Sequence, residues 1–111
     1  MNEFAAGLYV VATPIGNLGD LSPRARDVLA AAALVAAEDT RTSSTLLRLA
    51  GSSARAVSLT EHNVAARAPE IVAAAREGVV ALVSDAGTPV VADPGARLVE
   101  AAHGSGVPVF A

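Results

Sequence analysis

The chain has 111 residues, a formal net charge of -3, and a composition that is 52% hydrophobic but only 3% aromatic. That length suits one domain, and the absence of cysteine excludes disulfides and thiolate metal sites. All the cationic residues are arginine and are outnumbered by acidic ones, so either nucleic acid is not the partner or the basic surface lies elsewhere.

Apolar strand-like runs alternate with helix-like segments from the start of the chain. Residues 8–12 predict a first buried strand, and a helix follows with Ser22 as its N-cap. Residues 34–37 predict a second strand. The next helix, over residues 42–50, is expected to end at Gly51, a residue typical of helix C-termini.

The alternation continues in the second half of the chain. Residues 56–59 predict a third strand, and the helix after it is expected to carry Pro69 in its first turn and to end at Gly78. Residues 80–83 predict the fourth strand. A final helix is expected to begin at Asp93 and Pro94, with the aspartate as N-cap.

Gly104 is expected to end that helix, and a fifth strand begins at Val107. Five apolar strands alternating with four helices predict an α/β fold, a five-stranded parallel sheet with helices on both faces. The sequence stops at Ala111, within or at the end of the fifth strand, so we expect a segment of a longer protein.

Neither end of the chain nor its interior predicts a membrane partner. No basic start followed by an apolar region marks a signal peptide. The longest mainly apolar stretch, residues 28–37, is about half the ~20 residues that a bilayer span needs. We therefore expect a cytoplasmic protein.

Polar residues follow each of the first four predicted strands. The four segments are residues 13–20, 38–41, 60–63 and 84–89. In an open parallel sheet the carboxyl ends of the strands meet at one edge, where ligands bind. The connections at the opposite edge are plain, so we expect the ligand site at the carboxyl edge.

Several ligand classes can be separated by what these segments contain. The first segment lacks the third glycine of a dinucleotide-binding loop, and a chain without lysine has no P-loop. An uncharged or zwitterionic ligand suits it better. We expect no metal site, although Asp85 and Asp93 carry the oxygen ligands that magnesium prefers. Asp93 also fits an N-cap, Arg41 a surface ion pair, and His62 a loop residue without a role.

Four stretches together resemble one family. They are "LYVVATPIGNLGDLSPRA" (8–25), "AAEDTR" (36–41), "EHN" (61–63) and "ALVSDAGTPVVADPG" (81–95). In order and spacing the chain resembles the N-terminal lobe of the small-subunit ribosomal RNA methyltransferase I family, within the tetrapyrrole methylase superfamily. The resemblance covers nearly the whole chain.

The resemblance implies a fold and a reaction. Residues 1–111 would form a tetrapyrrole-methylase-like N-terminal lobe, and the C-terminal lobe would lie outside this chain. The implied reaction is S-adenosylmethionine-dependent methylation of a ribose 2′-hydroxyl in the decoding region of small-subunit (16S) ribosomal RNA. The implied protein is a homodimer with its cofactor between the two lobes, so we expect the 111 residues alone to be inactive.

The resemblance also points to site residues. The cofactor-binding positions that it implies are Pro14, Gly16, Ser84, Asp85, Ala86, Gly87 and Thr88. Asp39, Arg41 and His62 lie on the expected rim and are the candidates for catalysis, although no role is assigned to any of them.

Three alternatives remain open at this point. A tetrapyrrole (uroporphyrin or corrin) methyltransferase is the alternative within the superfamily. A non-catalytic binding or dimerisation module is the second. The third is a sugar kinase, because residues 85–88 match a short Asp-x-Gly-Thr phosphate-binding element.

Overall fold

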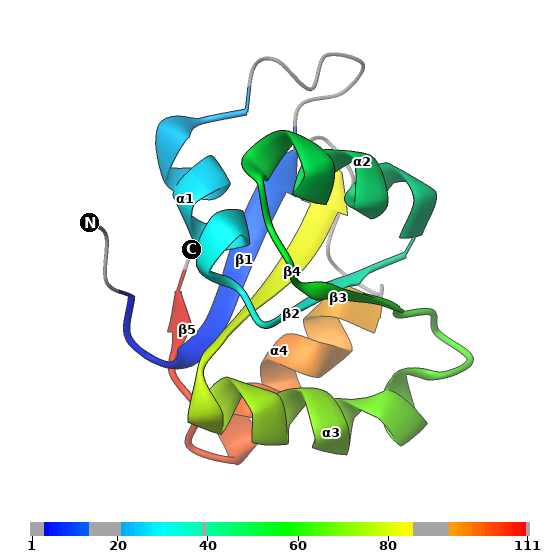
Figure 1. Cartoon of the computed structure of the whole chain (residues 1–111). Coiled ribbons are helices and arrows are strands. Elements are labelled where there is room, and N and C mark those ends of the chain that lie inside the picture. The colour runs from blue at the N-terminus through cyan, green and yellow to red at the C-terminus, as the bar shows by residue number, and fades with distance from the viewer. Residues whose placement is uncertain (1–3, 14–20, 39, 86–93, 111) are drawn as a thin grey trace.

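The computed structural model describes residues 4–13, 21–38, 40–85 and 94–110 (Figure 1). Strands and helices alternate throughout these segments. In chain order they are β1 (Gly7–Thr13), α1 (Pro23–Ala31), β2 (Leu34–Ala37), α2 (Thr40–Ala50), β3 (Arg55–Ser58), α3 (Val64–Glu77), β4 (Val79–Asp85), α4 (Pro94–Gly104) and β5 (Val109–Phe110).

The strands form one sheet in the order β3-β2-β4-β1-β5, and every neighbouring pair is parallel. Helices α1 and α2 lie on one face of this sheet, and α3 and α4 lie on the other (Figure 1). The predicted fold, a five-stranded parallel sheet with helices on both faces, is confirmed.

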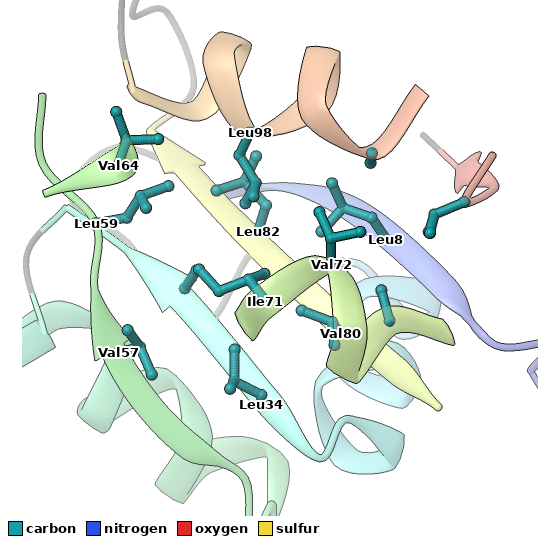
Figure 2. Close-up of a cluster of buried hydrophobic side chains, with 14 residues drawn as sticks. Leu8, Leu34, Val57, Leu59, Val64, Ile71, Val72, Val80, Leu82 and Leu98 are labelled. Carbon is teal, nitrogen blue, oxygen red and sulfur yellow. The ribbon is translucent and has the colours of Figure 1, made fainter. Parts of the chain in front are cut away.

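Alternate residues of the central strand β4 serve two separate cores. Val80 and Leu82 point toward α3 and α4, where they pack with Ile71 and Leu98 (Figure 2). Ala81, between them in sequence, belongs to the cluster under α1 and α2. Because side chains alternate across a strand, burial on both faces gives the continuous apolar runs seen in the sequence.

The two central strands are longer than predicted. The sequence predicts strands over residues 8–12 and 80–83, but β1 and β4 pair continuously from Gly7↔Val79 to Thr13↔Asp85. Each strand supplies the hydrogen-bonding partners that the other's backbone needs, so polar residues continue the strands. Ser84 and Asp85 therefore belong to β4 and not to the loop after it.

Helix α3 begins earlier than predicted. Pro69 was expected in the first turn, but α3 starts at Val64 and Pro69 lies inside the helix. An interior proline removes the hydrogen bond to the carbonyl four residues earlier, here Ala65. Both Pro69 and Ala65 are exposed, so water can hydrate that carbonyl group.

After two of the helices, α2 and α4, the chain turns at a glycine in the left-handed conformation. Gly51 has φ 68°, and the amide of Ser52 donates to Leu47, so the predicted end of α2 is confirmed. Helix α4 ends at Gly104, as predicted, but Gly104 is not the left-handed residue. It is Gly106 that has φ 73°, and Val107 donates to Ala102 across the same kind of motif.

Two leucines in α2 test how much burial in the core contributes to the stability of the fold. Leu46 is 0% exposed, whereas Leu49 is 56% exposed. We expect Leu46→Ala to lower the free energy of unfolding by about 2–5 kcal/mol, because it leaves a cavity. Leu49→Ala should change it by less than about 0.5 kcal/mol. Urea unfolding followed by circular dichroism measures the free energy of unfolding of both variants. Similar losses of stability in the two would contradict the burial of Leu46 and the exposure of Leu49.

Gly7 tests the contact between β1 and the segment that leads into β5. A Cβ atom built on Gly7 would lie 2.8 Å from the Pro108 carbonyl oxygen and 2.8 Å from Cε2 of Phe110. Gly7→Ala should therefore cost about 1–3 kcal/mol of stability.

Gly78 provides the matched control for that substitution. A Cβ atom there meets nothing within 4 Å, and φ is -168°, an extended value open to any residue. Gly78→Ala should leave the midpoint of thermal unfolding unchanged or raise it, by up to about 1 kcal/mol in stability. Equal changes in stability for the two substitutions would show that the close approach of Pro108 and Phe110 to Gly7 does not limit the side chain at that position.

Candidate functional site at the carboxyl edge of the sheet

The carboxyl ends of β1 and β4 lie side by side, with Thr13 paired to Asp85. From β1 the chain continues to α1 on one face, and from β4 it continues to α4 on the other face (Figure 1). This divergence is a topological switch point, the place where open α/β sheets bind ligands. The candidate site is therefore centred on the ends of these two strands.

Strand β4 extends beyond its other neighbour. Ala37, the last residue of β2, pairs with Val83, so the next two residues of β4 have no partner in β2. On the other side Ser84 pairs with Ala12 of β1. Ser84 is half-buried, and Asp85 follows it as the last residue of the strand.

The turn after β3 is held by Asn63. Its Oδ1 accepts a hydrogen bond from the Thr60 amide at 2.8 Å, and its Nδ2 donates to the Ser58 carbonyl at 3.0 Å. These two bonds fix the path from the end of β3 into α3. His62, the preceding residue, is exposed, and its amide donates to the Thr60 hydroxyl at 3.2 Å.

This turn is also tied to its neighbours on both sides. The Ser58 hydroxyl donates to the carbonyl of Glu38, just after β2, at 3.5 Å. From the other side the Arg97 guanidinium, in the first turn of α4, donates to the Glu61 carbonyl at 3.4 Å. The turn after β3 therefore forms one flank of the carboxyl edge.

A family model described as Tetrapyrrole (Corrin/Porphyrin) Methylases matches residues 7–111. The chain belongs to this family. Among its relatives are proteins named Ribosomal RNA small subunit methyltransferase I. The one from Mesorhizobium japonicum is 52% identical over 103 residues and the one from Escherichia coli O157:H7 is 48% identical over 103 residues.

Each alignment covers 92% of this chain, but only 35% and 36% of the two relatives, so the chain spans about a third of their length. Among solved structures, a uroporphyrin-III-C-methyltransferase from Thermus thermophilus has a TM-score of 0.67 and 27% identity. That match covers 95% of this chain and 46% of the other. The tetrapyrrole methylase fold inferred from the sequence is confirmed.

The structure places four of the site residues that the sequence predicted. Ser84 and Asp85 lie together at the end of β4, next to β1. Arg41 is exposed in the first turn of α2, which begins at Thr40 rather than at residue 42. His62 lies beyond β3, and β2 separates β3 from β4, so His62 is on the flank of the edge and not at its centre.

The remaining site predictions lie outside the described residues. They are Pro14, Gly16, Asp39, Ala86, Gly87 and Thr88, together with the predicted N-cap Asp93. In the described part of the chain, no group of three His, Cys, Asp or Glu residues comes together to hold a metal ion. None of the helices described there is long and apolar enough to cross a membrane.

Substitutions in the Glu-His-Asn stretch separate the structural residue from the candidate functional one. Asn63→Ala should lower the free energy of unfolding by about 1–3 kcal/mol, because it leaves the Thr60 amide and the Ser58 carbonyl without their partner. His62→Ala removes an exposed side chain and should change stability by less than about 0.5 kcal/mol.

The conservative variant Asn63→Asp keeps the acceptor but loses the donor, and we expect an intermediate loss. Urea unfolding ranks the three variants. A His62→Ala variant as unstable as Asn63→Ala would contradict the division between the two residues.

Proposed function

We propose that the full-length protein that carries this chain is an S-adenosylmethionine-dependent methyltransferase of small-subunit ribosomal RNA. The observation that carries the proposal is the difference in identity between two kinds of relative. The proteins named Ribosomal RNA small subunit methyltransferase I are 52% and 48% identical, whereas the uroporphyrin methyltransferase is 27% identical over a similar share of the chain.

The chemistry of the candidate site suits S-adenosylmethionine. This cofactor carries two cationic groups, an ammonium and a sulfonium, and its ribose needs hydrogen-bonding partners. An acidic residue follows a half-buried serine at the end of β4, and the chain has no lysine to hold a triphosphate. We infer that Ser84 and Asp85 contact the cofactor, together with Pro14, Gly16, Ala86, Gly87 and Thr88.

The proposed acceptor is a ribose 2′-hydroxyl in the decoding region of the RNA. S-adenosylmethionine supplies a methyl group on a sulfonium, and transfer to oxygen requires that the hydroxyl lie in line with that bond. A hydroxyl is a weak nucleophile, so a side chain that accepts its proton would help. Asp39 and His62 are the candidates for that part, and Arg41 for holding an RNA phosphate.

The site proposed here requires more protein than these residues. We propose that residues 1–111 form the N-terminal lobe, and that a C-terminal lobe closes the cofactor cleft. Closure would exclude water and strengthen each hydrogen bond to the ligand. We further propose that the complete enzyme is a cytoplasmic homodimer.

A tetrapyrrole substrate is the second candidate. The description of the matching family and the fold shared with a uroporphyrin-III-C-methyltransferase favour it. One fold supports many substrates, so the fold does not decide between the two acceptors.

Transfer of a labelled methyl group decides between them. The full-length protein, given methyl-labelled S-adenosylmethionine, should label the RNA of small ribosomal subunits and not uroporphyrinogen. Labelled nucleotides should resist alkaline cleavage at their 3′ side, because a 2′-O-methyl group blocks the attack of the ribose oxygen on the phosphate.

The 111-residue chain by itself serves as a control and should transfer no methyl group. Label in the tetrapyrrole alone would overturn the proposed substrate. Label in RNA that remains sensitive to alkali would retain an RNA methyltransferase but place the methyl group on a base.

A further inference from the structure

Charged residues are distributed unequally between the two helical layers. Helices α1 and α2 carry four arginines and one acidic residue, Asp27. Helices α3 and α4 carry three arginines and three glutamates. A chain with a net charge of -3 therefore has a basic face over α1 and α2. The four arginines of this face are Arg24, Arg26, Arg41 and Arg48.

The arginines of the opposite layer have local structural partners. Arg67 pairs with Glu70 at 3.1 Å, Arg76 donates to the Ser105 carbonyl at 3.1 Å, and Arg97 donates to the Glu61 carbonyl. These contacts explain why cationic side chains stand at those positions without any reference to a ligand.

Two arginines of the basic face differ in this respect. Arg24 and Arg41 make interactions within the protein. The side chains of Arg26 and Arg48 are both exposed, and neither makes a hydrogen bond or ion pair within the described part of the chain. Their guanidinium groups keep their full capacity to donate to a partner molecule.

Helix position adds a second, independent observation. Arg24 and Arg26 lie in the first turn of α1, and Arg41 lies in the first turn of α2; neither turn contains an acidic residue. The positive end of the helix dipole disfavours cations there, so helix stability does not account for three arginines at these places. Arg48, in the last turn of α2, is at the favourable end.

The outer surface of α2 extends the basic face along the helix. Arg41, Ser44 and Arg48 are all exposed and are spaced three and four residues apart, so they form a single stripe. The stripe begins at the carboxyl edge, where Glu38 precedes the helix, and runs away from it. Two guanidinium groups with a hydroxyl between them match a row of phosphates.

We propose that the face formed by α1 and α2 binds the phosphate backbone of the ribosomal RNA substrate beside the methylation site. This inference rests on the proposed function. Both helices start at the carboxyl edge, so RNA held on this face reaches the candidate site directly (Figure 1). The phosphate contacts position the RNA, and the reading of sequence or shape is left to other parts of the enzyme.

Charge reversal in the full-length protein tests the proposal. Arg26→Glu and Arg48→Glu, singly and together, should weaken binding to small-subunit ribosomal RNA transcribed in vitro. Each replacement should reduce the slope of log affinity against log salt concentration by about one, as expected for one phosphate contact. Arg26→Glu should not lower the melting temperature, because a carboxylate suits a helix N-terminus.

The matched control is Arg76→Glu, which reverses a charge in the last turn of α3, on the opposite face and away from the carboxyl edge. We expect it to leave RNA affinity and salt slope unchanged. In methylation assays the double variant should raise KM for RNA several-fold, while kcat and the affinity for S-adenosylmethionine stay at wild-type values. A purely structural effect would also lower kcat and the affinity for S-adenosylmethionine.

Several results would overturn the proposal. One is a double variant with wild-type RNA affinity and salt slope, and another is an equal loss in Arg76→Glu, which would indicate a general effect of net charge. Weaker binding to assembled small subunits with unchanged binding to free RNA would show that the face contacts a protein. If the wild type methylates ribosomal RNA while the variants behave normally, this inference alone fails. A wild type that neither binds nor methylates RNA overturns the proposed function as well.

Discussion

The rest of the structure depends on the parallel pairing of β1 with β4 at the centre of the sheet. The two strands are hydrogen-bonded along their whole length, and each has a further strand on its other side. Crossover connections in parallel sheets are right-handed. The chain leaves β1 toward β2 and leaves β4 toward β5, in opposite directions across the sheet, so α1 and α4 must lie on opposite faces. The same geometry produces two separate cores and the divergence at the carboxyl edge where a ligand can bind.

Much of this architecture could be predicted from the sequence because its determinants are local. The apolar run Leu34–Ala37 forms β2 with the predicted bounds, and Ser22 caps α1 by accepting a hydrogen bond from the Ala25 amide. The failures have non-local causes. Ser84 and Asp85 read as loop residues by polarity, but the neighbouring strand satisfies their backbone. Pro69 is tolerated inside α3 because it lies on the exposed side, and a sequence pattern does not show that.

The candidate site was predictable as an edge of the sheet, but the roles within it were not. One short stretch, Glu61 to Asn63, contains a residue that anchors the backbone next to one that is exposed. An asparagine that precedes a helix and follows a threonine by three residues was a usable signal, because such side chains cap turns. The distance of His62 from the centre of the site could not be predicted from the sequence, because it depends on the order of the strands in the sheet. That order puts β2 between the strand before His62 and the strand that ends at Asp85.

The net charge of the chain averages over two helical layers that differ in charge. Helices α3 and α4 carry as many glutamates as arginines, whereas α1 and α2 carry four arginines and one aspartate. The proposed function brings a small methyl donor together with an RNA polyanion, and only the polyanion needs an extended basic surface. The proposed RNA site depends on the local charge of the face over α1 and α2, which a small negative net charge of the whole chain does not exclude.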